Sequence, residues 1–126
     1  QVPMMFNNLP AILPMVKSGK LRALTVATPQ RSRLLPDVPT MEEAGFKGYV
    51  STVWNGVYVR AGTPRTAVER LNREIVAALA SAELRGSLEA QGFDLIPSTP
   101  EQLGQLAQTD SVRWGAVVKA SGATID

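Results

Sequence analysis

The sequence predicts an α/β fold in which helices flank a mixed sheet, and three observations support this prediction. Residues 2–27 show the order strand, helix, strand. A long run of β-prone residues follows at Val50–Val59, and from residue 61 onwards apolar residues recur mainly at helical spacing. Because a helix separates the first two strands, their connection is long enough for the parallel crossover of an α/β sheet.

The first three elements have clear boundaries in the sequence. The apolar run Val2–Phe6 predicts a buried strand, which the next two asparagines end. Apolar residues at helical spacing predict a helix from Leu9 to Val16, and Gly19 ends it. A second strand is predicted at Leu21–Ala27, between this glycine and a proline-rich loop.

The middle of the chain is expected to contain a capped turn and a long strand. Thr40 and Glu43, which follow the proline-rich loop, have the spacing of a capping box. Val50–Val59 predicts a strand that is interrupted at Gly56, because glycine within a strand often marks a bend or a close backbone approach. Residues 93–97 are expected to add a short edge strand.

Three capping patterns predict the helices of the second half. Thr63 is the expected N-cap of the first of these helices, with Pro64 at the first helical position. Ser81 is the expected N-cap of the next helix. Thr99 and Gln102 repeat the capping-box spacing and predict the start of the last helix.

The composition excludes several classes of function. The 126 residues contain no cysteine and no histidine, which excludes disulfides, thiolate chemistry and the commonest metal ligand. The lysine and arginine residues are scattered and the net charge is only +2, which argues against nucleic-acid binding. No nucleophile and base are arranged for catalysis, and no cofactor motif is present. We therefore expect a protein that is not an enzyme and has no catalytic residues, cofactor or metal site.

Five groups of residues together resemble one protein family. The groups are Met4-Met5-Phe6-Asn7-Asn8-Leu9-Pro10, Gly19-Lys20-Leu21-Arg22-Ala23-Leu24, Leu35-Pro36-Asp37-Val38-Pro39-Thr40, Trp54-Asn55-Gly56-Val57 and Trp114-Gly115-Ala116-Val117-Val118. In order and spacing they resemble the tripartite tricarboxylate transporter solute receptors, also called Bug or TctC-type periplasmic binding proteins. Each group alone is a weak signal, whereas the whole series is specific.

The resemblance implies a partial fold of the periplasmic binding protein type II-like class, with two lobes and the ligand between them. Because the family's receptors are longer chains, this chain is expected to be their C-terminal portion. Residues 1–50 then correspond to the end of the second lobe. Residues 51–126 correspond to a crossing strand and a mainly helical return to the first lobe.

The resemblance also implies a function in transport. A receptor of this family captures a small organic carboxylate through backbone N–H groups and ordered water. It then delivers the ligand to the membrane permease subunits of a tripartite tricarboxylate-type transporter. We recognise no signal peptide in these residues, so a periplasmic location is expected from the resemblance alone.

Four residues are the candidate ligand contacts. Ligands of open α/β sheets bind beyond the carboxyl ends of the strands, and Asn7, Asn8 and Thr28 follow the first two predicted strands. Trp54 lies on the predicted crossing strand and is expected near the ligand. Asn8 would also suit the cap of the following helix, and Trp54 would equally suit the core. The family commonly has aspartate at the position of Asn7, where asparagine removes the charge and adds a donor.

A hypothesis from another class is a non-binding fragment that acts only as an interaction or domain-swapped module. Unpaired strand edges and apolar faces favour pairing with another chain. Self-association of the fragment is therefore the corresponding partner prediction, and size-exclusion chromatography separates it from a monomeric receptor segment.

Overall fold

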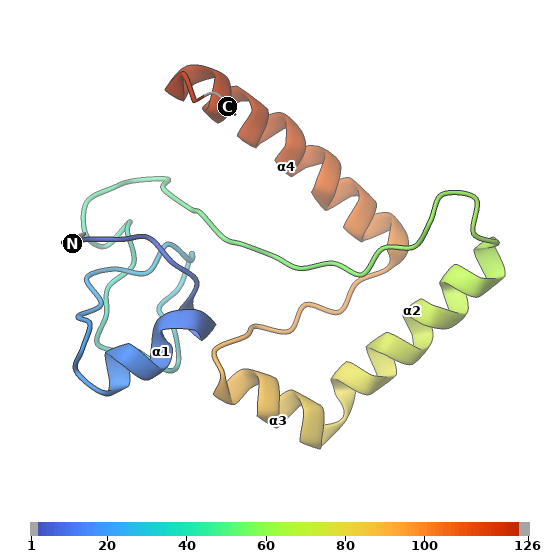
Figure 1. The fold of residues 1–126 in the computed structure, drawn as a ribbon, viewed down its shortest axis with the longest axis horizontal. Coiled ribbons are helices and arrows are strands. Elements are labelled where there is room, and N and C mark those ends of the chain that lie inside the picture. Colours follow the sequence, from blue (N-terminus) through green and yellow to red (C-terminus); the bar gives the residue numbers. More distant parts are fainter. Residues whose placement is uncertain (1–2, 124–126) are drawn as a thin grey trace. The chain divides into compact units, whose positions relative to one another are not determined.

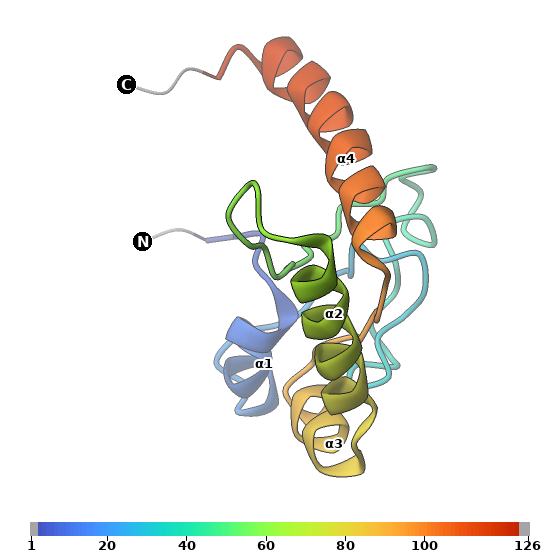
Figure 2. The same ribbon diagram turned by 90° about the vertical axis from the view of Figure 1, so that its right-hand side faces the viewer.

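A computed structural model describes residues 3–123 (Figures 1 and 2). These residues contain four helices: α1 (Leu9–Lys17), α2 (Arg65–Ala80), α3 (Ala82–Ala90) and α4 (Pro100–Ser121). The chain divides into two compact units, the first formed by residues up to 55 and by 82–95, the second by residues 56–81 and those from 96. None of the helices within residues 3–123 combines the length and the apolar character that crossing a membrane requires.

The first unit contains α1, α3 and the proline-rich loop. The prediction of a helix after the two asparagines is confirmed by α1, whose residue Leu13 is only 4% exposed. Thr40 and Met41, which follow the loop, are also buried. Gly92 ends α3 with a φ of +96° and lies so close to α1 that an added Cβ would be 3.2 Å from Leu9 Cγ. This glycine therefore permits close approach of the two segments.

The predicted mixed sheet is not confirmed. Among residues 3–123, sheet pairing is limited to an isolated parallel bridge between Val26 and Thr40. The parts of the predicted strands at 3–6, 21–27, 50–59 and 93–97 are not strands in the structure, apart from the bridge residue Val26, and Val2 lies outside the described residues. A strand is completed by the backbone groups of its neighbours, and these segments lack continuous ladders with any described segment. The β-prone sequence is present, but the pairing is not.

The second unit is organised by α2 and α4. The side chain of Asn72 in α2 donates from Nδ2 to the carbonyl of Ser98 at 2.8 Å, just before α4 begins. Arg65, at the start of α2, pairs with Glu69 at 2.7 Å and with Glu101 of α4 at 3.4 Å. These contacts fix the first turn of α4 against α2. Figure 2 shows α4 as one continuous helix.

Both predicted capping boxes are formed, whereas the hydroxyls of the other two predicted caps bond backwards along the chain. Thr99 and Gln102 form the expected capping box, with reciprocal hydrogen bonds of 3.2 and 2.9 Å. The box of the loop at residues 40–43 is also formed. Thr63, however, donates its hydroxyl to the carbonyl of Arg60, and Pro64 occupies the N-cap of α2. Ser81 directly precedes α3, as predicted, but it is also the C-cap of α2 and donates its hydroxyl to the carbonyl of Ala78. In both cases a backward bond to the preceding turn replaces the forward cap.

Candidate functional site

The candidate site is built at the carboxyl end of the extended segment Leu21–Ala27. The N–H of Val26 donates to the carbonyl of Pro39 at 2.9 Å, and the carbonyl of Val26 accepts from the N–H of Met41 at 2.9 Å. This pair of bonds forms the parallel bridge at Thr40. It closes the proline-rich loop at its base, because the residues before and after the loop are joined directly.

A further segment is attached on the opposite side. The carbonyl of Ala27 accepts from the N–H of Ser51 at 3.0 Å. Successive residues of an extended chain direct their backbone bonds to opposite sides, so Val26 and Ala27 bind different neighbours. Thr28 therefore directly follows the place where three segments of the first unit are hydrogen-bonded together. These are the segment that ends at Ala27, the segment around Thr40, and the segment from Ser51 that carries Trp54.

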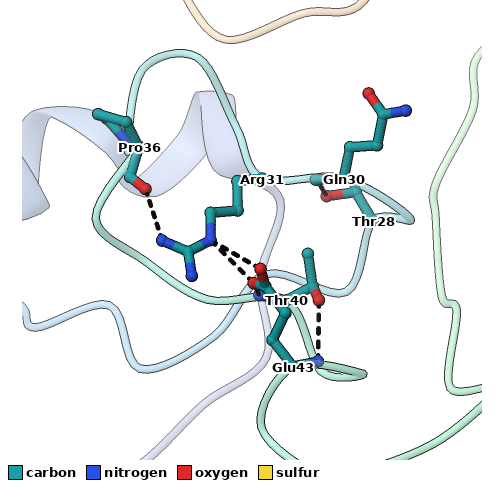
Figure 3. A network of polar contacts seen from close by, with 6 residues as sticks. All are labelled: Thr28, Gln30, Arg31, Pro36, Thr40 and Glu43. Carbon is teal, nitrogen blue, oxygen red and sulfur yellow. Dashed lines mark hydrogen bonds and ion pairs between the residues drawn. The ribbon is translucent and has the colours of Figure 1, made fainter.

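The side chain of Thr28 is fixed within its own loop. Its hydroxyl Oγ1 donates to the carbonyl of Gln30 at 2.6 Å (Figure 3). A threonine hydroxyl has one proton to donate and two lone pairs that can accept. Since Thr28 is only half-buried and its proton is already used, the side chain presents acceptor capacity towards its surroundings.

Arg31 crosses the loop that follows Thr28 (Figure 3). Its Nε donates to both carboxylate oxygens of Glu43, at 3.1 and 2.8 Å, and its Nη1 donates to the carbonyl of Pro36 at 3.1 Å. Glu43 also accepts the N–H of Thr40 at 2.8 Å, and Thr40 Oγ1 accepts the N–H of Glu43 at 3.1 Å. We call Arg31, Pro36, Thr40 and Glu43 the Arg31 bridge. It connects the beginning, the middle and the end of the loop.

The Arg31 bridge keeps its two charged groups ionised. The hydrogen bond from Arg31, followed by that from the Thr40 backbone, lowers the pKa of the Glu43 carboxyl below its usual range. The hydrogen bond to Glu43 in turn raises the pKa of Arg31. The two side chains are 45% and 46% exposed, so solvent screens their attraction. The bridge therefore defines loop geometry more than it adds stability.

A pocket of about 320 Å³ lies beside the Arg31 bridge. Its lining residues are Pro29, Gln30, Arg31, Thr40, Glu42 and Glu43. The one cation of this lining is already neutralised by a carboxylate, so the pocket does not offer an unpaired positive charge to an anion. Within residues 3–123, no group of three or more acidic side chains is placed to hold a metal ion.

Asn7 and Asn8 lie at the start of α1, where Asn7 forms hydrogen bonds through its side chain and Asn8 through its backbone. The Oδ1 of Asn7 accepts the N–H of Asn8 at 2.8 Å, whereas among residues 3–123 its Nδ2 has only a long contact of 3.7 Å to Met5 Sδ. The amide N–H groups of Asn7 are thus the part of this exposed side chain with spare capacity. Asn8 is the N-cap of α1 as predicted, but its side chain makes no cap hydrogen bond.

The structure connects two of the four predicted contacts through a backbone hydrogen bond between their segments. The bond between Ala27 and Ser51 places the segment leading to the half-buried Trp54 beside the residue before Thr28. The hydrogen bonds of Asn7 and Thr28 remain within two residues of each side chain, so no hydrogen bond joins these two residues. The roles of all four residues in ligand binding stay predictions.

Sequence reasoning missed the Arg31 bridge. The spacing of Thr40 and Glu43 predicted their capping box, but no motif in the sequence indicated a partner for Arg31. Its ion pair spans twelve positions of the sequence, and a local pattern carries no signal for such a contact. The density of prolines in the loop was the one hint that its course would be fixed.

Comparison with known proteins identifies the family. The model of the tripartite tricarboxylate transporter family receptors matches residues 1–123. Protein BugT of Bordetella pertussis is 36% identical over 119 residues, which cover 94% of this chain and 36% of BugT. A protein from the tcbD-tcbE intergenic region of a Pseudomonas species is 34% identical over 119 residues, covering 94% of this chain and 35% of that protein.

Solved structures show the same relationship. A Rhodopseudomonas palustris protein with adipate has a TM-score of 0.82 at 32% identity, covering 90% of this chain and 38% of the other. MatC from Rhodopseudomonas palustris with bound malate has a TM-score of 0.75 at 34% identity, covering 87% and 38%. The chain thus spans well under half the length of these relatives. The members of their family are solute-binding receptors rather than enzymes. On the family match, this chain belongs to the tripartite tricarboxylate transporter receptor family.

Proposed function

We propose that this chain serves a periplasmic receptor that captures a small organic carboxylate for a tripartite tricarboxylate-type transporter. The observation that carries this proposal is the family match over residues 1–123. Two relatives with solved structures, at 32% and 34% identity, hold adipate and malate. Both ligands are small organic acids, so a carboxylate is the class of ligand that we infer for this chain.

The arrangement of the whole receptor follows from the same proposal. Residues 1–50 would supply the end of the second lobe, and residues 51–126 the crossing segment and the return to the first lobe. The ligand would be enclosed between the lobes and passed to membrane permease subunits. The absence of helix and strand in residues 50–59 agrees with this role, because a crossing segment joins two lobes and does not have to lie within one sheet.

The four candidate contacts have complementary chemistry in this proposal. The free amide N–H groups of Asn7 suit a carboxylate oxygen, since its Oδ1 is already bonded to Asn8. Asn8 adds a second amide at the same point. Thr28 contributes a hydroxyl at the end of the extended segment, and Trp54 can cover the apolar part of a solute. All four are neutral, as expected for capture by hydrogen bonds rather than by a salt bridge.

The replacement of Asn7 by alanine tests the assignment of this residue. In the complete protein that carries this chain, Asn7→Ala should weaken binding of the carboxylate by about ten- to a hundredfold, because a hydrogen bond to a charged group contributes roughly 1.5–3 kcal/mol. The matched control is Gln108→Ala, which removes an exposed amide from α4 and should leave affinity unchanged. Isothermal titration calorimetry measures both. Equal affinities of Asn7→Ala and the unaltered protein would remove Asn7 from the site.

A module that only interacts with other chains is the second candidate, and the exposed apolar side chains favour it. Met4, Phe6 and Val57 are 64%, 74% and 66% exposed. Exposed apolar surface of this kind promotes association. A dimer or larger species of this chain in size-exclusion chromatography, combined with no carboxylate binding, would support this candidate. A monomer that binds a carboxylate would rule it out.

A further inference from the structure

We propose that Thr28 acts towards the solute as a hydrogen-bond acceptor and thereby selects carboxylates that also carry a donor, such as a hydroxyl or an ammonium group. This inference rests on the proposed function, because it takes Thr28 to face the ligand. It states that Thr28 accepts a hydrogen bond from the solute and does not donate one, which neither the family match nor the presence of a threonine specifies.

The one proton of the Thr28 hydroxyl is already used in a hydrogen bond within the loop. Thr28 Oγ1 donates to the carbonyl of Gln30 at 2.6 Å, which is a short distance for a hydroxyl donor (Figure 3). A hydroxyl cannot donate fully to two acceptors at once, but its two lone pairs remain able to accept. An approaching carboxylate would therefore meet lone pairs at Thr28, whereas an approaching hydroxyl or ammonium group would find a partner.

The carbonyl of Gln30, which accepts the Thr28 proton, is itself held in place. The carbonyl of Gln30 belongs to the planar peptide unit that joins Gln30 to Arg31. The side chain of Arg31 is tied to Glu43 by two hydrogen bonds and to the carbonyl of Pro36 by a third. Movement of the Gln30 carbonyl away from Thr28 would strain or break these contacts. The Arg31 bridge thus keeps the Thr28 proton directed into the loop.

The backbone on the other side of Thr28 is also anchored. Val26 is bonded to both Pro39 and Met41, and Ala27 is bonded to Ser51. Because the backbone before Thr28 is anchored by these bonds and the backbone after it is tied to the Arg31 bridge, Thr28 Oγ1 and the carbonyl of Gln30 are kept within hydrogen-bond distance. The acceptor polarity is therefore a property of the folded loop before any solute arrives.

Asn7 provides the opposite polarity. Its Oδ1 is occupied by the N–H of Asn8 at 2.8 Å, and its Nδ2 has only the long contact to Met5 within the described part of the chain. An amide with its oxygen engaged and its N–H groups spare favours an anionic oxygen. A solute with a carboxylate for Asn7 and a donor for Thr28 matches both, as a hydroxy acid or an amino acid would.

The test compares malate with succinate, which share both carboxylates and differ by one hydroxyl. Binding is measured by isothermal titration calorimetry on the complete protein that carries this chain, with Thr28→Val and Thr28→Ser. The unaltered protein should bind malate about tenfold more tightly than succinate. Thr28→Val should abolish this preference by weakening malate alone, since valine keeps the shape and removes the acceptor. Thr28→Ser retains the hydroxyl and should keep the preference.

Each alternative outcome has a distinct meaning. Equal weakening of malate and succinate by Thr28→Val would show that Thr28 donates to a carboxylate, which overturns this inference and leaves the proposed function standing. Unchanged affinities would place Thr28 outside the site and also overturn it. An unaltered protein that binds neither acid would overturn this inference, and it would overturn the proposed function as well if it also failed to bind adipate. If Thr28→Val does not fold, equal affinity of the unaltered protein and Thr28→Ser for the two acids overturns the inference.

Discussion

At the scale of single residues, Arg31 shows how an exposed charge can have a defined structural role. Its side chain is 45% exposed, yet it makes three hydrogen bonds to two different parts of the loop. An ion pair at this exposure contributes little to stability because water and salt screen it. Its main consequence is geometric, since it fixes the peptide unit on which the Thr28 hydroxyl depends.

The pH dependence of stability tests the Arg31 bridge. The pKa of Glu43 is lowered in the folded protein, so folding favours the ionised carboxylate. This contribution is present above about pH 4.3, the ordinary glutamate pKa, and is lost as pH falls through the lower folded value. Glu43→Gln should therefore lower the Tm slightly at pH 6, and the difference from the unaltered protein should shrink towards pH 3.

The neighbouring carboxylate gives the control for this experiment. Glu42 lines the same pocket but has no ion-pair partner within residues 3–123, so Glu42→Gln should leave the Tm almost unchanged at pH 6. Thermal unfolding followed by circular dichroism at several pH values measures both variants. A Glu43→Gln deficit that stays constant from pH 6 to pH 3 would contradict the role assigned to the carboxylate charge.

Residue patterns predicted local contacts well and distant contacts poorly. Both capping boxes follow from a spacing of three residues, and both are formed. Thr63 and Ser81 have the residue type of a cap, but their hydroxyls bond backwards to the preceding turn. The choice between forward and backward bonds depends on the backbone course, which a single residue type does not determine.

At the scale of elements, helices were predictable and strands were not. A helix satisfies its backbone within one segment, so the sequence of α1 or α4 contains most of what is needed to recognise it. A strand requires a neighbour, and among the described residues the sheet pairing of segments 21–27 and 50–59 is limited to the bridge at Val26, since the bond between Ser51 and Ala27 is not extended into a ladder. Their β-prone composition was read correctly, but composition alone does not supply pairing.

Two glycines test how the segment after residue 55 meets α4. An added Cβ on Gly56 would lie 3.0 Å from Tyr58 Cε2 and 3.1 Å from both methyl carbons of Leu103, whereas Gly104 in α4 has open space around it. Gly56→Ala should lower the free energy of unfolding by about 1 kcal/mol through overpacking. Gly104→Ala should raise it by about 0.5–1 kcal/mol, because alanine favours helix.

Urea denaturation measures both glycine variants under the same conditions. Since the two changes add the same methyl group, a difference of opposite sign isolates the steric contact at Leu103. Stabilisation of similar size in both variants would show that the extended segment does not pack on the first turn of α4.

At the scale of the whole molecule, the match to the receptor family extends over both units of the chain. The series of motifs indicated the family, and the match over residues 1–123 confirms it. The sequence did not predict the division into residues up to 55 with 82–95 and the remainder, because contacts between distant segments define these units. The candidate site belongs to the first unit, where the loop network orients Thr28.

The most direct test of the account is calorimetric titration of the complete protein that carries this chain with malate, adipate, succinate and succinamide. Succinamide keeps the succinate skeleton and replaces both carboxylates with neutral amides. A carboxylate receptor should bind at least one of the three acids saturably and should not bind the diamide. Absence of binding by all three acids, or equal affinity for succinate and succinamide, would contradict it.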